Sequence, residues 1–493
     1  MELQFNETSV QAFQDLTRVN KSVQLAMESV VPDTKDDIGR ILSVRPEIYL
    51  KSKELRSKTV SITGEAQVTV LYINEDETAV SFFSVSQSFL QEWECPAALD
   101  SDFLQLRLQI GGVQARILNP RKLSADLEIM ADFTISRSVE TVISQELPEA
   151  NRTPIHVQRS KQNAVLTTAI CEKSFSLNEQ LPFPETEREP GYLIGKDLNY
   201  MIREREVVGS RLLLKGEAQI ELLYMPSEAL IPCSCRLSIP FSQLIDLGTE
   251  QAETADVWIE ATSDYLSLID SLDGRKLLDV ELHAMAQVRS MRNQKLQLIT
   301  DGYSNQMPCE CSFCEQATCE RIRQVPVRLR SEEQVDLPEE YQDLLFSCAT
   351  MEACTAEQGS AEADLLCRSK DGKLFAMRRK LKLWQEEEYD DVDANDFRLS
   401  DFHISRVDGQ LVLSLCAEAV GQLRETNTIR LAESLTLDEE QRYDAASYPS
   451  LTAVWAQTES VWELAKQYHS SPEAICEMNP DPDRRPIFIP KAK

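Results

Sequence analysis

A nine-residue pattern occurs three times in the chain and limits the fold more than any other feature. It reads GEAQVTVLY from Gly64 to Tyr72 and GEAQIELLY from Gly216 to Tyr224. A more divergent copy reads GSAEADLLC from Gly359 to Cys367. Positions three, five, seven and nine are apolar or small, which is the period of a β-strand with one buried face. Positions four and six are polar in the first two copies, so we expect the second face of each strand to be mostly exposed to solvent. Position eight, on the same face, is leucine in all three copies.

The spacing of the copies is close to a domain length and too long for a solenoid unit of about 20–50 residues. At about 150 residues per domain, the 493 residues predict three domains and a remainder. We place β repeats at 1–145, 146–300 and, more divergent, 301–437, then a linker at 438–450 and a small domain at 451–493. The leading glycine of each copy indicates a close approach or an unusual φ/ψ at the start of its strand.

Each repeat is predicted to end in a hairpin. The turn signals Asn119-Pro120, Asp273-Gly274 and Asp408-Gly409 each precede a run of alternating apolar residues. Asp-Gly between such runs is a strong hairpin signal because both turn residues need positive φ. Short strands with few helical patterns predict a mainly β chain of three tandem β-sandwich or open-barrel-like repeats, followed by a small βααβ domain. The sequence does not decide between sandwich and barrel.

The charge of the chain excludes two classes of partner. Its net charge is −30, from 81 acidic and 51 basic residues, and this field repels nucleic acids and anionic membrane surfaces. No apolar run approaches the about 18 residues of a membrane span, and residues 1–13 lack the apolar core of a signal peptide. We therefore expect the protein to remain where it is made, without membrane insertion, and its 13 cysteines to be reduced.

Four closely spaced cysteines, Cys309, Cys311, Cys314 and Cys319, are the candidate metal ligands of the sequence. Thiolates at short spacing hold zinc or iron–sulfur clusters. Their spacing is not that of paired C-x-x-C knuckles, however, and Cys309, Cys311 and Phe313 alternate as one apolar strand face. We favour buried free cysteines, keep a metal site as the weaker alternative and expect no cofactor.

Patterns of catalytic residues are absent from the sequence. The four histidines, His156, His283, His403 and His469, are not at ligand spacing from one another. We find no G-x-G-x-x-G, P-loop, G-x-S-x-G or H-E-x-x-H motif. Acidic residues are so frequent that carboxylate pairs arise by chance and do not indicate a glycosidase. We expect a protein without enzymatic activity, and a hydrolase with an unrecognised site is the least favoured alternative.

The last forty-odd residues predict two short helices between two strands. Ser460 and Glu463 form a capping-box pattern ahead of an apolar stripe at helical spacing. Ser471 is placed to cap a second helix with Pro472 at its first position, which is where proline is preferred. Residues 487–490 read as the closing strand.

This tail resembles a LysM domain. The resemblance rests on Ser460-Val461-Trp462-Glu463-Leu464-Ala465, Tyr468, Asn479-Pro480 and Ile487-Phe488-Ile489-Pro490. LysM domains commonly bind N-acetylglucosamine-containing glycans beside two loops, but this chain has Thr458-Glu459 in place of the usual Gly-Asp, and the usual Gly-Gln is shortened to Asp483-Arg484-Arg485. These departures weigh against glycan binding. The resemblance implies partner-binding residues at Gln457, Thr458, Glu459, Trp462, Ile475, Asn479 and Pro480. For Trp462 and Tyr468 we favour a place in the core and rim of the small fold over a dedicated contact.

Residues 1–430 resemble the SPOCS repeats of bacterial spore-coat morphogenetic proteins. The resemblance is carried by the Gly-Glu-Ala-Gln…Leu-Tyr strand, Ile239-Pro240-Phe241, the turn at 119–123 and the hairpin strand after it. SPOCS repeats followed by one LysM domain are the layout of SipL-like coat proteins of clostridial spore formers. This layout implies a cytoplasmic scaffold of the mother cell, at the forespore surface. Such a protein docks through LysM onto the ATPase of the coat basement layer, joins other coat proteins and promotes encasement. The alternative is a peptidoglycan- or GlcNAc-glycan-binding protein of the cell wall or spore cortex.

Overall fold

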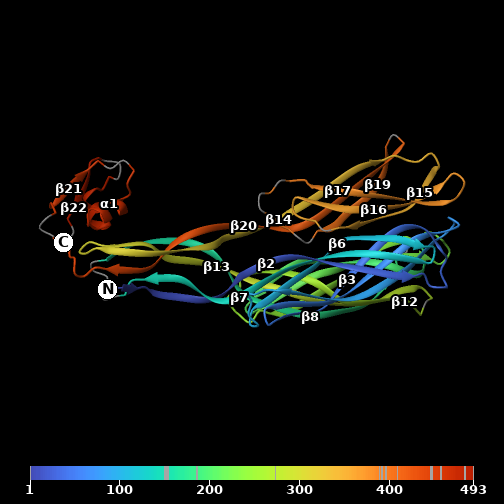
Figure 1. Ribbon diagram of the computed structural model, residues 1–493, viewed down its shortest axis with the longest axis horizontal. Coiled ribbons are helices and arrows are strands. Elements are labelled where there is room, and N and C mark those ends of the chain that lie inside the picture. The colour runs from blue at the N-terminus through green and yellow to red at the C-terminus, as the bar shows by residue number, and fades with distance from the viewer. Residues whose placement is uncertain are drawn as a thin grey trace.

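The computed structural model of the chain is mainly β, with a broad head, a narrow stalk and a small tail (Figure 1). It describes residues 2–148, 155–184, 187–272, 274–352, 354–387, 389, 392–394, 397–407, 409–444, 448–455, 458–481 and 485–491. Within these ranges no helix is long and apolar enough to cross a membrane. The mainly β fold class predicted from the alternating patterns is confirmed.

Residues 6–437 consist of three sets of strands, here called the first unit (6–146), the second unit (155–304) and the third unit (309–437). Each unit begins and ends with a long strand, and its two long strands pair antiparallel. The pairs are β2 (Asn6–Val30) with β7 (Lys122–Glu146), β8 (Ile155–Pro182) with β13 (Lys276–Ser304), and β14 (Cys309–Val335) with β20 (Gln410–Leu437). The short β1 (Glu2–Gln4) also pairs with β20.

A three-stranded antiparallel meander lies between the long strands of each unit in the chain. The meanders are β3 (Ile38–Arg56), β4 (Thr59–Asn74) and β5 (Val80–Glu94), then β9 (Pro190–Val208), β10 (Arg211–Pro226) and β11 (Cys233–Asp246), then β15 (Tyr341–Met351), β16 (Gln358–Ser369) and β17 (Leu374–Gln385). The repeated sequence lies on the middle strand each time. That the units are copies of one domain, with the predicted bounds, stays a prediction.

The predicted hairpins are present at the end of each unit. They join β6 (Phe103–Asn119) to β7, β12 (Thr254–Asp270) to β13, and β19 (Arg398–Val407) to β20. Gly274 and Gly409 have φ values of 80° and 87°, as the turn chemistry requires, while Asp273 and Asp408 lie outside the described residues. In the third unit the short β18 (Val392–Asp393) adds a further pairing with β20.

The first two units each pack a meander against a sheet of long strands. Alternating side chains of the repeat, such as Val68 and Ile220, are buried in these two cores, and Tyr72 and Tyr224 are fully buried beside them. Single residue pairs between β7 and β13 and between β2 and β8 also close four long strands into a barrel-like ring. In the third unit β14 pairs with β17, so both layers belong to one sheet. The chain therefore combines features of the sandwich and of the barrel.

The second face of the repeated strands is buried where the three units meet. Leu71, Leu223 and Leu366, the eighth residues of the three copies, lie in one apolar cluster with side chains from all three units. Among the polar sixth residues, Thr69 is buried and Asp364 is buried against Arg378, whose Nε lies 2.8 Å from its carboxylate. The prediction of a mostly wet second face is wrong here, because the outer faces of the three meanders pack against one another.

The glycine that begins each copy allows a close approach of neighbouring groups. A Cβ atom at Gly64 would lie 2.3 Å from the ring of Phe89, and one at Gly216 would lie 2.6 Å from the ring of Phe241 and 2.3 Å from the carbonyl oxygen of Met201. Any side chain would displace the ring that covers this position. The predicted close approach is confirmed, but β4 and β10 begin five residues earlier, so the glycine lies inside its strand.

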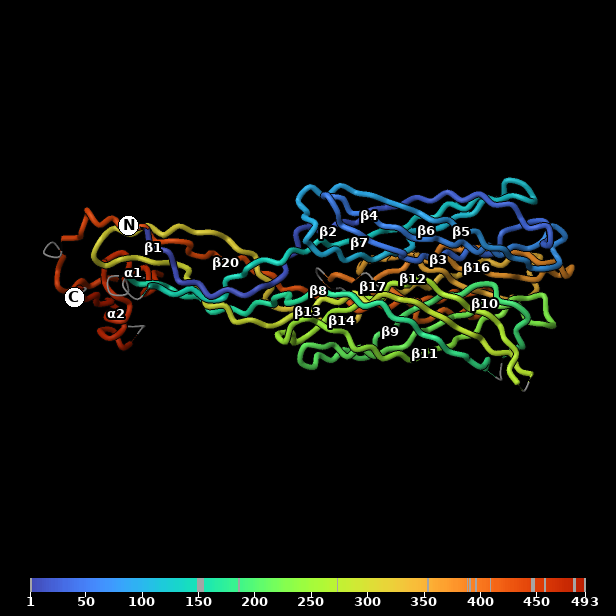
Figure 2. The backbone as a smooth tube through the Cα atoms, turned by 90° about the horizontal axis from the view of Figure 1, so that it is seen from below, coloured from blue at the N-terminus to red at the C-terminus, as the bar shows by residue number. Residues whose placement is uncertain are grey.

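The long strands continue beyond the head and form the stalk (Figure 2). Its apolar core takes Ile155 and Ile299 from the second unit and Leu435 from the third, together with Leu147, which directly follows the first unit. One step closer to the head, Leu298 and Leu431 lie together in a second cluster, and Val142 of the first unit packs against it. Because the three strand pairs share these cores, the stalk is one bundle that carries the tail at its tip.

The tail has the predicted order of strand, helix, helix and strand. Its elements are β21 (Leu451–Val454), α1 (Val461–Gln467), α2 (Pro472–Met478) and β22 (Ile487–Pro490), and β21 pairs with β22. Both caps predicted from the sequence form: Ser460 and Glu463 make a capping box, and the Ser471 side chain accepts from the backbone of Ala474. These caps satisfy amide groups that the short helices leave without partners.

Candidate functional site

The core of the tail is completed by a residue of the stalk. Leu464, Ala465, Ile475 and Ile489 form the buried centre of the tail together with Tyr303 of β13. The Tyr303 hydroxyl donates to the backbone oxygen of Ser470 at 2.7 Å. A domain of about 40 residues is marginal on its own, so this shared core fastens the tail to the stalk tip and stabilises both.

Trp462, a predicted partner contact, lies at this junction. Its ring meets Tyr303 edge-on at a centroid distance of 5.0 Å, and its Nε1 donates to the carboxylate of Asp301 at 2.8 Å. Lys466 Nζ lies 2.8 Å from each oxygen of the same carboxylate. Asp301 therefore joins two side chains of α1 to the stalk, and the docked tail presents Trp462 to its own chain.

The remaining predicted partner residues of the tail differ in exposure. The side chain of Ile475 is only 1% exposed and belongs to the core. The Asn479 side chain links α2 to β22. Its Nδ2 donates to the carbonyls of Ile475 and Phe488 at 2.8 and 2.6 Å, and its Oδ1 accepts from the Phe488 amide. Thr458, Glu459 and Pro480 are exposed. Contact of these three residues with a partner stays a prediction, and Gln457 lies outside the described residues.

One exposed aromatic residue of the tail was missed by the sequence reasoning. Trp455 follows the end of β21 and is 74% exposed. Met478, at the end of α2, is a second exposed large apolar residue of the tail. Tryptophans are enriched at the centres of binding surfaces. The signal available in the sequence was a tryptophan directly ahead of the polar stretch that ends in Thr458-Glu459.

Two histidines lie at the junction between tail and stalk. His156 of β8 stacks on Tyr303 at 5.2 Å, and His469 of the tail packs on Tyr443 at 3.9 Å. Burial lowers the pKa of both imidazoles, and Glu473, 3.9 Å from His156, only partly offsets the effect there. The docked tail therefore favours the neutral form of both histidines.

The four candidate metal ligands do not converge. Cys309, Cys311, Cys314 and Cys319 follow one another along β14 with free thiols. At about 3.3 Å per residue, the strand separates Cys309 from Cys319 by roughly 30 Å. Within the part of the chain that the structure describes, no three potential ligands gather at one point. Burial also raises the pKa of Cys309 and of Cys311 to about 11, so both thiols are protonated at neutral pH.

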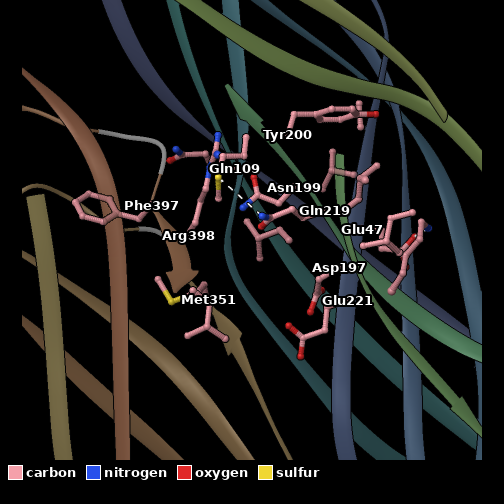
Figure 3. A pocket seen from close by; sticks show the side chains of 18 of the residues that line it. Glu47, Gln109, Asp197, Asn199, Tyr200, Gln219, Glu221, Met351, Phe397 and Arg398 are labelled. Atoms are coloured by element: carbon pink, nitrogen blue, oxygen red, sulfur yellow. Dashed lines mark hydrogen bonds and ion pairs between the residues drawn. The ribbon is translucent and has the colours of Figure 1, made fainter. Parts of the chain in front are cut away.

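A cavity of about 820 Å³, here called the acidic cavity, lies where the three units meet in the head (Figure 3). Its wall takes Glu47 from the first unit, Asp197 and Glu221 from the second, and Met351 and Arg398 from the third. Eight carboxylates and four cationic side chains line it. Glu221 is the polar sixth residue of the second copy, so the repeated strand itself supplies part of the wall.

Lys196 joins the first two units at the wall of the acidic cavity. Its Nζ lies 2.7 Å from Glu47, 2.9 Å from Asp264 and 3.0 Å from the Tyr49 hydroxyl. Burial alone would lower the pKa of Lys196, but the two carboxylates raise it above its ordinary value. The ammonium group is therefore charged and engaged, and the cluster holds the two units in register.

Comparison with known proteins identifies one segment of the chain. Residues 37–118 match the family model described as SipL, SPOCS domain. The match begins beside the first residue of β3 and ends within β6, so it covers the first meander and the strand that follows it. No curated protein and no solved structure matches the chain. The first unit therefore contains a segment similar to the SPOCS domain of SipL.

Proposed function

We propose, from the similarity of residues 37–118 to the SPOCS domain of SipL, that this chain is a non-enzymatic scaffold of spore-coat morphogenesis. It acts in the mother-cell cytoplasm at the forespore surface and promotes encasement by the coat. The family match is the observation that carries this proposal. The second and third units are further SPOCS copies, a reading supported by the same strand order in each unit and by the matching glycine–phenylalanine contacts at Gly64 and Gly216.

A rigid three-unit body suits a scaffold. The units share the apolar cluster around Leu71, Leu223 and Leu366, and the ion pair between Arg45 and Asp197 joins the first unit to the second. Cores shared in this way resist relative motion of domains, unlike small polar interfaces. The stalk sets the tail apart from the head (Figure 1). The chain therefore holds two surfaces at a fixed separation, which is what a protein that links components of an assembly must do.

The tail is a LysM domain in this proposal, and it docks onto the ATPase of the coat basement layer. Its contact surface lies at the loops of Thr458-Glu459 and Pro480, with Trp455 as the apolar anchor. Trp462 serves the junction with the stalk instead. A protein partner fits better than a glycan, because the two loops depart from the family pattern and Trp462 is covered.

The direct test is capture of the purified basement-layer ATPase by the full chain and by a variant lacking residues 451–493. Loss of capture supports the proposal, and undiminished capture ends the docking claim. Because the deletion uncovers Tyr303, the variant Trp455→Ala is tested in parallel. This residue is exposed, so folding is retained, and we expect capture to weaken at least tenfold. Leu118→Ala, which truncates an exposed apolar side chain of the head, is the control.

Glycan binding is the second candidate, favoured by the βααβ order of the tail and its exposed Trp455. Sedimentation with purified peptidoglycan or spore cortex distinguishes the two functions. Saturable binding to the wall without capture of the ATPase would replace the scaffold proposal. Absence of wall binding with retained capture supports it.

A further inference from the structure

A second cavity, of about 450 Å³ and here called the arginine cavity, lies between the three units. It takes residues from β2, β6 and β7 of the first unit, β9, β12 and β13 of the second, and β14, β18, β19 and β20 of the third. Eight arginines and five carboxylates line it, a surplus of three positive charges. This is unexpected in a chain with a net charge of −30. The acidic cavity next to it has the opposite balance, and the two cavities share a wall that includes Arg107 and Trp258.

Several arginines of this cavity are engaged with its carboxylates. Arg289 makes a bidentate pair with Asp15, with distances of 2.8 and 2.6 Å. Arg18 donates to Asp393 and, at 3.1 Å, to Asp132. Arg328 and Glu418 pair at 2.9 Å, and Arg205 lies 3.8 Å from Asp256. Each of the five carboxylates thus has an arginine partner. Of the other four arginines, Arg203 lies 3.6 Å from Glu217, which is outside this cavity, and Arg398 is engaged as well, so the surplus rests mainly on the remaining two.

Arg107 and Arg424 supply part of that surplus. Among the described residues neither forms an ion pair within 4.0 Å: Arg107 lies over the ring of Trp258 at 5.7 Å, and Arg424 donates to the Gln422 side chain at 3.3 Å. Burial would raise the pKa of the Asp393 carboxyl, but Arg18 and, more weakly, Arg424 and Arg107 lower it below its ordinary value. Groups from the first and third units therefore act on one point of the cavity.

Two buried donors in the cavity wall lack partners in the structure. Gln105 is 2% exposed, and its Nε2 has no hydrogen-bond partner. Its Oε1 accepts from Arg289 at 3.0 Å, which fixes the amide with the Nε2 group free. The indole Nε1 of Trp258 is also buried without a partner, and an indole nitrogen only donates. A buried donor without a partner costs about 1–3 kcal/mol, so a group that accepts hydrogen bonds here is favoured.

We propose that the arginine cavity binds a small molecule that carries two or more phosphate groups. Arg107 and Arg424 hold the phosphate oxygens, and Gln105 and Trp258 donate to them. The arginine fork matches phosphate geometry, and two guanidinium groups together with two neutral donors suit an anion with several phosphates better than a single phosphate. A volume of about 450 Å³ leaves room for such a molecule. The acidic cavity, with eight carboxylates, repels the same ligand.

Binding at this position connects all three units, so the ligand stabilises the assembled head by mass action. This inference does not depend on the role in the spore coat. It is independent of the tail as well, since all residues of the site lie between β2 and β20.

The test uses the full chain in a phosphate-free buffer with tripolyphosphate as the probe. Isothermal titration is expected to give saturable binding of about one molecule per chain, and thermal scanning a rise of the melting temperature with probe concentration. Citrate and sodium chloride at equal ionic strength serve as charge controls. An equal effect of citrate or chloride, or the absence of saturable binding, would overturn the proposal.

Two substitutions locate the site. Arg107→Gln and Arg424→Gln are each expected to weaken binding at least tenfold. Arg236→Gln is the matched control, because Arg236 is an exposed arginine that lines only the acidic cavity. Unchanged affinity in both arginine variants, with the fold confirmed by thermal unfolding without probe, would refute the assignment. Arg107→Lys keeps the charge without the fork, and an intermediate affinity is expected.

Discussion

Replacement of Leu223 by alanine tests the idea that the three units share one core. The side chain is 2% exposed and lies in the apolar cluster that also holds Leu71 and Leu366. Loss of the buried methyl groups and the cavity left behind cost about 2–5 kcal/mol in such a site. On a wet strand face the same change would cost less than about 0.5 kcal/mol. We expect about 3 kcal/mol for Leu223→Ala and less than about 0.5 kcal/mol for the control Leu90→Ala, which is 58% exposed on β5.

The assay must report on each unit separately, because a chain of several units does not unfold in one step. Native-state hydrogen exchange read by mass spectrometry meets this need. Leu223→Ala should reduce protection in β4 and β16 as well as in β10, since the cluster spans the three middle strands. The double variant Leu223→Ala/Leu366→Ala should differ from additivity by at least about 0.5 kcal/mol. Loss confined to the second unit, or additive effects, would refute the shared core.

Three further predictions concern the tail junction and the repeated glycine. Asp301→Ala removes the acceptor of Trp462 and Lys466, and we expect docking of the tail to weaken by about 1.5–3 kcal/mol, seen as faster hydrogen exchange in residues 451–491. Burial holds the pKa of His156 and His469 below the ordinary value of about 6.5. Docking of the tail is therefore complete above that pH and weakens as the pH falls below it, because the imidazoles must then be protonated in the undocked state. Hydrogen exchange of residues 451–491, measured from pH 7.5 to 5.5, checks this pH dependence. Gly216→Ala should destabilise the second unit by about 1–3 kcal/mol in thermal scanning, because its Cβ would lie 2.3 Å from a backbone oxygen, whereas Gly195→Ala meets its nearest neighbour at 4.0 Å and should be tolerated.

A different result would contradict each of these three predictions. Unchanged exchange in the Asp301 variant would mean that the Tyr303 contact alone holds the tail. Docking that is flat across the pH range would show that protonation of His156 and His469 does not oppose docking of the tail. Equal melting temperatures for the two glycine variants would mean that the covering phenylalanine moves aside without cost.

Local geometry was readable from the sequence. A period of two residues predicted the strands that carry Val68 and Ile220. Asp-Gly pairs predicted the turns at Gly274 and Gly409, where the structure has positive φ. The capping-box pattern of Ser460 and Glu463 predicted the first helix of the tail. Each of these depends on residues a few positions apart, so the chemistry is contained in a short segment.

What covers each face was decided by tertiary structure. The eighth leucines and the sixth polar residues face other units, and Trp462 faces Asp301, about 160 residues earlier in the chain. Of the predicted tail contacts, Thr458, Glu459 and Pro480 are exposed, whereas Ile475 and Asn479 support the fold. A strand pattern states that one face is apolar, but whether the second face meets water or another unit depends on how distant segments pack, and no short stretch of sequence carries that information.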